Sequence, residues 1–249
     1  MDTPLSSCRI AAIGAGRLGV ALSGALRAAG LGVEGPLQRG ASAAGADVVL
    51  LCVPDAEIGS AARALDVATD AFVGHCSGAT GIDVLAGHRA FSLHPLMTVT
   101  ADGASFAGAS CAVAGATADA LAVAEALAGA LGMTPTTIAD EDRVAYHAAA
   151  SMASNFLVTL EGAAERLAQT AGAPRALLVP LVRATVENWA LAGPEHALTG
   201  PIARGDEATV QRQRDAVAQR TPELLDLFDA MTRATRDLAG RPVPAGAAS

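Results

Sequence analysis

The stretch that decides the fold is Ile10-Ala11-Ala12-Ile13-Gly14-Ala15-Gly16-Arg17-Leu18-Gly19, which joins a strand, a glycine-rich turn and the start of a helix. Each glycine is needed for a different purpose. Gly14 allows a tight turn, Gly16 lets the backbone approach a pyrophosphate closely, and Gly19 allows the helix to contact the strand. The free N–H groups that open the helix would then hold the phosphates. The motif predicts a dinucleotide site whose turn consists of Gly14, Ala15, Gly16, Arg17, Leu18 and Gly19.

Around this motif, the first half of the chain alternates short β-branched runs with alanine-rich helical runs. Such alternation predicts right-handed βαβ crossovers and a mostly parallel, doubly wound sheet. The expected strands are residues 9–13, 31–35, 46–53, 71–75, 110–114 and 134–138. The expected helices are residues 18–29, 56–65 and 118–131.

The second half is predicted to be helical throughout. Three acidic residues at 140–142 favour the start of a helix that should run over 142–169. The next helix, over 174–192, contains Pro180, which should kink it or delay its start. Two further helices are expected over 207–219 and 222–238.

These patterns predict an α/β protein of two domains. A Rossmann domain should occupy residues 1–138, and an all-α domain for substrate binding and dimerisation residues 139–240. The Gly-, Pro- and Ala-rich residues 241–249 should form a disordered tail.

The composition excludes several classes of protein. A net charge of −8 without a basic cluster argues against nucleic acid or an anionic membrane as partner. No apolar run reaches the roughly 20 residues of a membrane span, and no signal peptide precedes the first strand, so we expect a cytoplasmic protein.

The four cysteines form no C-x-x-C pair, so neither a metal site nor a disulfide framework is expected. All 17 basic residues are arginine, which excludes any mechanism that needs a lysine of this chain.

The choice between NAD and NADP depends on the end of the second strand. NAD enzymes place an acidic residue there to bind the ribose hydroxyls, but Glu34 falls too early, inside the strand. Arg39 stands where a 2′-phosphate needs a cation, with Ser42 nearby as a donor, which favours NADP. The alternative is that Arg39 is a solvated loop charge. Val53 and Pro54 end the third strand and should lie against the cofactor.

Hydride transfer to a carbonyl or imine needs a proton donor. His94 follows a short apolar run and stands at the end of a strand before Pro95, which should fix a local turn. It is the sharpest candidate, although a hydrogen-bonded structural role stays open. His75 and Ser77 end another strand and should border the nicotinamide, while His75 itself could simply point into packing.

Two segments of the second half offer a substrate site. His147, Ser151 and Asn155 are spaced i, i+4, i+8, so they share one helix stripe, which is either a substrate wall or a solvated face. Arg204, in the loop Leu198-Thr199-Gly200-Pro201-Ile202-Ala203-Arg204-Gly205-Asp206, either clamps a carboxylate or pairs with Asp206.

Together these motifs resemble the superfamily of phosphogluconate dehydrogenases, pyrroline-carboxylate reductases and prephenate dehydrogenases. Within it, Leu93-His94-Pro95-Leu96, Tyr146-His147 and the 198–206 loop resemble a group that joins a Rossmann-like domain to a helical domain of unassigned function. The resemblance implies a phosphogluconate-dehydrogenase-like helical domain that forms a homodimer. Gln38-Arg39 resembles the NADP-phosphate contact of pyrroline-carboxylate reductases, and Leu93-His94-Pro95 the stretch with the catalytic histidine of prephenate dehydrogenases. The helix lysine of the hydroxyisobutyrate, phosphogluconate and ketopantoate enzymes is absent here.

We therefore expect reversible hydride transfer between NADPH and a small oxo- or imino-acid. His94 would be the proton donor and Arg204 the anchor of the substrate carboxylate. The stripe of His147, Ser151 and Asn155 would form the substrate wall. Two alternatives remain: a non-catalytic NADP-binding sensor or assembly protein, and a prephenate-dehydrogenase-like enzyme acting on a cyclic substrate.

Overall fold

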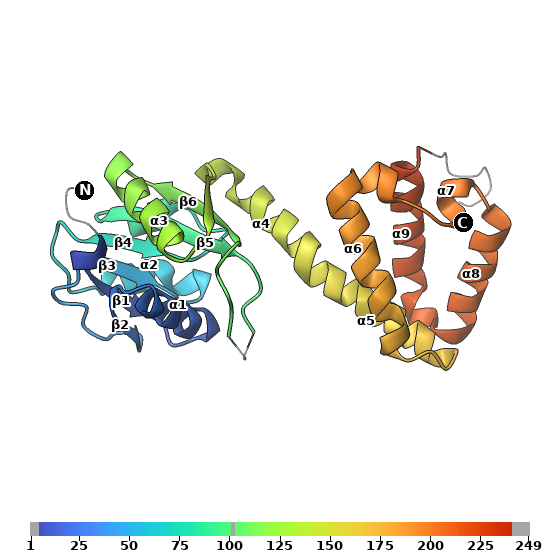
Figure 1. The fold of residues 1–249 in the computed structure, drawn as a ribbon, viewed down its shortest axis with the longest axis horizontal. Coiled ribbons are helices and arrows are strands. Elements are labelled where there is room, and N and C mark those ends of the chain that lie inside the picture. The colour runs from blue at the N-terminus through green and yellow to red at the C-terminus, as the bar shows by residue number, and fades with distance from the viewer. Residues whose placement is uncertain (1–4, 101–102, 241–249) are drawn as a thin grey trace. The chain divides into compact units, whose positions relative to one another are not determined.

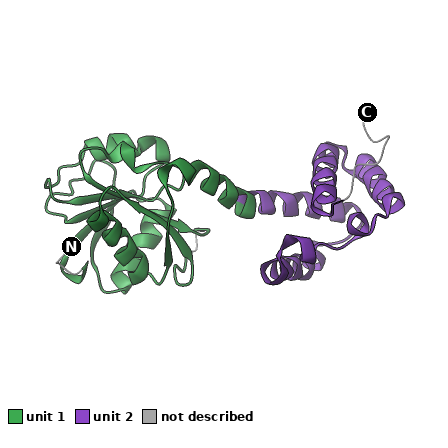
Figure 2. Cartoon of the chain, turned by 90° about the horizontal axis from the view of Figure 1, so that it is seen from above, with its two compact units in different colours: residues 1–154 green, residues 155–249 purple. Residues whose placement is uncertain are grey.

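The computed structural model describes residues 5–100 and 103–240 (Figure 1). The predicted tail, 241–249, lies outside the described residues. The chain divides into two compact units, residues 1–154 and 155–249 (Figure 2). Among the described helices, none has the length and apolar composition that crossing a membrane requires.

Unit 1 is built on a seven-stranded sheet in the order β2-β1-β3-β4-β5-β6-β7. All neighbouring strands are parallel except β5 and β6, which confirms the predicted mostly parallel sheet. All six expected strands are present. The strands are β1 Arg9–Ile13, β2 Gly32–Leu37, β3 Val48–Leu51, β4 Phe72–His75, β5 Arg89–Leu96, β6 Ser110–Gly115 and β7 Thr134–Thr137.

Strand β5 corrects the interpretation of His94 and Pro95. We expected a turn fixed by Pro95, but both residues lie inside β5, where they pair with Ala112 and Cys111 of β6. Pro95 lies beyond the part of β5 that pairs with β4, which ends at Ser92, so its missing N–H removes no hydrogen bond to β4.

Apolar residues on both faces of the sheet form the core of unit 1. In β3, Val48 and Leu50 face a cluster that includes α1 and α3, while Val49 and Leu51 face α2. This alternation follows from the two-residue period of a strand, and burial of both faces explains why β3 is continuously apolar. The helices of unit 1 are α1 Arg17–Ala28, α2 Ile58–Arg63, α3 Ala118–Ala130 and α4 Arg143–Ser151.

Unit 2 is helical, as expected. A π-helical turn, Met152–Phe156, lies between α4 of unit 1 and α5, within the helix that was predicted over 142–169. Pro180 keeps helical backbone angles, so the kink predicted there is wrong; the non-helical residue inside α6 is Gly193, with φ 74° and ψ 170°. The helices are α5 Leu157–Thr170, α6 Arg175–Ala197, α7 Pro201–Arg204, α8 Glu207–Arg220 and α9 Leu225–Leu238.

Candidate functional site

The glycine-rich turn joins β1 to α1, and its geometry explains why each of three positions holds glycine. Gly14 has a φ of 116°, and a Cβ there would collide with the carbonyl oxygen of Cys52. A Cβ at Gly19 would collide with the Gly14 carbonyl. A Cβ at Gly16 would meet nothing within 4 Å. Two of the glycines therefore let the turn pack closely, and the third leaves open space beside the start of α1.

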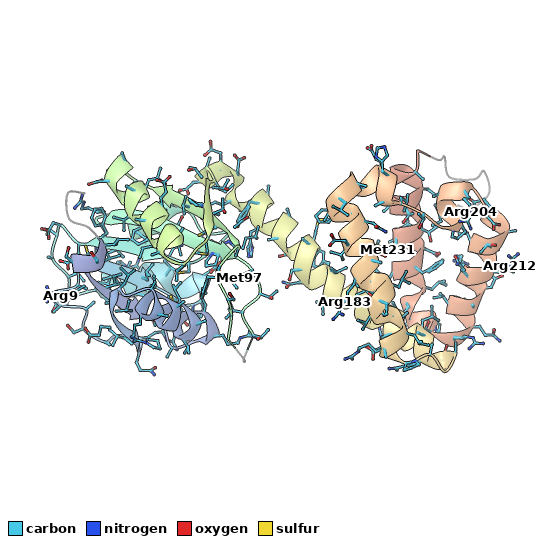
Figure 3. The ribbon with its side chains drawn as sticks, in the orientation of Figure 1. Arg9, Met97, Arg183, Arg204, Arg212 and Met231 are labelled. Carbon is cyan, nitrogen blue, oxygen red and sulfur yellow. The ribbon has the colours of Figure 1, made fainter. Side chains whose placement is uncertain are left out.

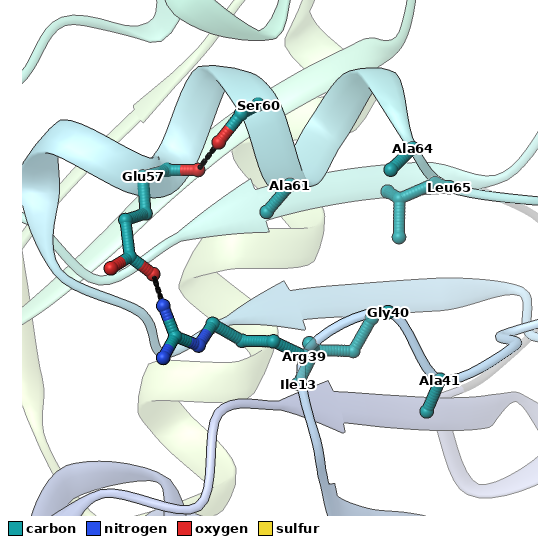
Figure 4. Close-up of a pocket in the computed structure, with 9 residues that line it drawn as sticks. All are labelled: Ile13, Arg39, Gly40, Ala41, Glu57, Ser60, Ala61, Ala64 and Leu65. Atoms are coloured by element: carbon teal, nitrogen blue, oxygen red, sulfur yellow. Dashed lines mark hydrogen bonds and ion pairs between the residues drawn. The ribbon is translucent and has the colours of Figure 1, made fainter.

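A pocket of about 370 Å³ lies where β1, β2 and β3 end (Figure 4). Arg39 reaches across it from the loop after β2 and forms an ion pair with Glu57, which comes before α2. The rest of the lining comes from the end of β1, the loop after β2, and α2 with the two residues that follow it: Ile13, Gly40, Ala41, Ser60, Ala61, Ala64 and Leu65. Val53 and Pro54 connect β3 to the 3₁₀ turn Asp55–Glu57, whose last residue lines this pocket.

The turn after β4 is held by the Ser77 side chain. Its hydroxyl accepts hydrogen bonds from the N–H groups of Ala79 and Thr80, at 3.2 and 3.0 Å, and donates to Asp55 at 2.8 Å. Ser77 therefore has a clear structural role in ordering this turn.

His75 is also explained by this turn. It is fully buried, and its Nδ1 accepts the Ser77 N–H at 3.2 Å, so Nε2 carries the proton and donates to the Gly81 carbonyl at 3.2 Å. Burial lowers the pKa of His75 and keeps the ring neutral. With both nitrogens occupied, His75 takes the packing role that the sequence left open.

His94 lies in a cluster with two residues of α4. Its Nδ1 is 2.9 Å from the Tyr146 hydroxyl oxygen, and its ring meets the His147 ring edge-on, with 5.8 Å between centroids. A Cβ at Gly78 would lie 2.9 Å from Nε2 of His94 and 2.7 Å from Cδ2 of His147. Gly78 therefore lies against the Nε2 edge of His94 where a larger residue would collide with it, and among the described residues none forms a hydrogen bond with Nε2.

Burial sets the protonation of the cluster. It lowers the pKa of His94 to about 4, with the nearby His147 and Arg143 adding to the effect. Burial also raises the pKa of Tyr146, so the phenol keeps its proton. At neutral pH the pair is thus a neutral imidazole hydrogen-bonded to a neutral phenol.

Arg143 fixes the first turn of α4 against the sheet. Its fully buried guanidinium donates to Asp140 Oδ1 at 2.8 Å, to the Ser77 carbonyl at 3.4 Å, and to the Ser92 hydroxyl. The other oxygen of Asp140 accepts the Ile82 N–H at 3.0 Å. Arg143 thereby ties α4, β5 and the turn after β4 into one rigid framework around His94.

Sequence reasoning missed Arg143 and Tyr146 as site residues. The signal was present, because Arg143, Tyr146 and His147 are spaced i, i+3, i+4 and so share one helix face. Tyr146 and His147 of that face contact His94.

The remaining candidates fall in different places. Ser151 ends α4 in unit 1, and the predicted stripe does not continue regularly to Asn155, because the wider π turn changes the angular spacing. Asn155 is exposed in unit 2. Arg204 is exposed at the end of α7 (Figure 3) and forms no ion pair within 4 Å among the described residues, although its charge is, after the hydrogen bond from Thr209, one of the causes that lower the pKa of Asp206. Asp206 instead caps α8 by accepting the Thr209 N–H at 3.0 Å.

The sequence from residue 109 to 235, more than half of the chain, matches the family model described as "Domain of unknown function (DUF2520)". The chain belongs to the DUF2520 family. No curated protein matches this DUF2520 chain.

Solved structures share the fold of this DUF2520 protein. BF3122 from Bacteroides fragilis, a "putative NADP oxidoreductase", has a TM-score of 0.82 at 20% identity, over 94% of this chain and 99% of its own. Protein TM1727 from Thermotoga maritima has a TM-score of 0.75 at 24% identity, over 93% and 98%. The Plasmodium falciparum pyrroline carboxylate reductase with NADP bound has a TM-score of 0.59 at 11% identity, over 94% and 99%. The predicted resemblance to pyrroline-carboxylate reductases is confirmed for the fold.

Proposed function

We propose that this DUF2520 protein is an NADP-dependent oxidoreductase that transfers hydride between NADPH and a small oxo- or imino-acid. The fold is shared with a pyrroline carboxylate reductase that holds NADP, and the site supplies the two elements that reduction of C=O or C=N requires. These are a place for the dinucleotide and a positioned proton donor.

The residues present fit NADP. Open space at Gly16 lets a pyrophosphate approach the backbone, and the start of α1 offers free N–H groups. Arg39 presents a guanidinium in the adjoining pocket, where a 2′-phosphate needs a cation. Arg17 and Leu18 at the start of α1, and Val53 and Pro54 after β3, complete the proposed cofactor site.

The observation that carries the catalytic assignment is the His94–Tyr146 hydrogen bond. A bound NADPH would supply the hydride to the substrate carbon. We assign the tautomer in which Tyr146 donates to Nδ1, so that neutral His94 carries its own proton on Nε2, the nitrogen beside Gly78. His94 gives that proton to the substrate oxygen or nitrogen while Tyr146 passes its own proton to Nδ1. The Tyr146 phenolate that is left then takes a proton from solvent water, which restores the site. Arg143 holds the framework in position.

The substrate contacts are proposed from side-chain chemistry. His147 meets the His94 ring edge-on and, with Ser151 one turn later on α4, would provide the polar substrate wall. The exposed guanidinium of Arg204 has the geometry to hold a substrate carboxylate with two hydrogen bonds.

Helix α6 favours a homodimer as the functional form. None of its 23 residues is buried, although Leu177, Leu181, Trp189 and Leu191 are large and apolar. A largely apolar pocket of about 540 Å³ lies between α5 and α6. Exposed apolar surface of this extent is typical of an interface. Light scattering should give the mass of a dimer, and Leu181→Glu should give a monomer that keeps its helical content. Location in the cytoplasm stays a prediction from the sequence.

The test of the function uses two variants and two measurements. Binding of NADPH is followed by nicotinamide fluorescence, and turnover by NADPH consumption with a panel of oxo-acids and cyclic imines. His94→Ala and Tyr146→Phe should both bind NADPH within a few-fold of the unmodified protein, while turnover is abolished in the first and strongly reduced in the second. Unchanged turnover in His94→Ala would refute the assignment, and no turnover with any substrate would favour the non-catalytic alternative.

A further inference from the structure

An acidic side chain lies in the proposed 2′-phosphate pocket, opposite the arginine. Glu57 and Arg39 form an ion pair across the pocket, with side chains that are 37% and 64% exposed (Figure 4). The pair joins two segments that are 18 residues apart in the sequence. A ligand entering this pocket therefore meets both charges.

The local structure holds Glu57 in this place. Glu57 ends the 3₁₀ turn Asp55–Glu57, in which its N–H donates to the Pro54 carbonyl at 2.8 Å. Its own carbonyl accepts the Ser60 hydroxyl at 2.9 Å (Figure 4). These two bonds fix the backbone of Glu57, so only its side chain can move when a ligand binds.

The two cofactors place different groups beside this carboxylate. NADPH carries a 2′-phosphate, which must displace Glu57 from Arg39 and then remain close to a like charge. Displacement costs little, because exposed ion pairs contribute little to stability, but the repulsion persists in the complex. NADH carries a 2′-hydroxyl instead, which can donate a hydrogen bond to a carboxylate, as in NAD-binding sites.

We propose that Glu57 is a specificity-determining residue that limits the preference of this protein for NADPH over NADH. It does so by competing with the 2′-phosphate for Arg39 and by accepting a hydrogen bond from the ribose of NADH. The inference rests on the proposed function, since it assumes that this pocket receives the adenosine half of the dinucleotide. In this proposal Arg39 favours NADPH and Glu57 favours NADH.

The experiment compares Glu57→Gln with the unmodified protein by titration with NADPH and with NADH at low and high salt. The substitution removes the charge and keeps the size. We expect the ratio of the NADH to the NADPH dissociation constant to rise about ten-fold at low salt, and the gain to shrink at high salt because its origin is electrostatic. Glu125→Gln, which makes the same change at an exposed position of α3 outside the pocket lining, is the matched control and should leave the ratio unchanged.

The outcomes separate this inference from the proposed function. A ratio within two-fold of the unmodified protein, or weaker NADPH binding in Glu57→Gln, overturns the role of Glu57 and leaves NADPH binding itself intact. A rise that comes from tighter NADPH binding and is equal at low and high salt also overturns it, because repulsion of the 2′-phosphate would then not be the cause. Failure of the unmodified protein to bind either dinucleotide overturns the proposed function, and this inference with it.

Discussion

Substitution of His94 by Gln tests whether burial holds this imidazole neutral. In the folded protein the pKa of His94 is lowered to about 4 from an ordinary value of 6.5. The unfolded chain therefore binds one more proton between these two pH values, so the free energy of unfolding falls as the pH falls through this range. Between pH 8 and pH 5.5, both above the isoelectric point near 5.0, the pKa difference corresponds to a loss of about 1.4 kcal/mol.

The assay is urea unfolding followed by circular dichroism at both pH values, for the unmodified protein and for His94→Gln. The variant should lose less stability on acidification, by about 1.4 kcal/mol, because Gln does not titrate. His75, whose pKa is also lowered, is present in both proteins, so its contribution cancels in the comparison. An equal loss in both proteins would refute the argument that His94 is held neutral by its surroundings.

Three further predictions concern the same unit. Gly78→Ala should push the rings of His94 and His147 aside and lower turnover by about 100-fold, with NADPH affinity unchanged in a fluorescence titration; full activity would show that the Nε2 edge of His94 is not used. Gly16→Val should weaken NADPH binding by at least about ten-fold with an unchanged melting temperature, because the added side chain meets ligand space and not protein; equal affinity would exclude this turn as the phosphate site. Tyr146 is the single tyrosine, so its ultraviolet titration should show one midpoint above pH 10, and a midpoint below 10 would contradict its burial.

The fold was predictable where the signals are local. The strand and turn over residues 9–19 depend on neighbours in the sequence, and the start of α1 follows from them. The continuation of β5 through His94 and Pro95 was not predicted, because Pro95 indicates a turn and the antiparallel pairing with β6 is a long-range contact. The helix predicted over 174–192 ends directly before Gly193, which adopts a positive φ without cost, while Pro180, where a kink or a late start was expected, keeps helical backbone angles.

The candidate site was predictable only in part, for a related reason. His94 and His147 were identified from motifs, and the structure brings them together. The partner of His94, Tyr146, and the buried Arg143 depend on how α4 packs against the turn after β4, which no single motif encodes. The Arg39–Glu57 pair likewise joins two loops that meet only because β2 and β3 lie on either side of β1.

The distribution of aromatic residues has a practical consequence for studies of folding. The single tyrosine, Tyr146, belongs to unit 1, and the single tryptophan, Trp189, is exposed on α6 of unit 2. Each unit therefore carries its own optical reporter without any labelling. If the two signals change at the same urea concentration, the units unfold as one cooperative system; if they change separately, each unit has a stability of its own.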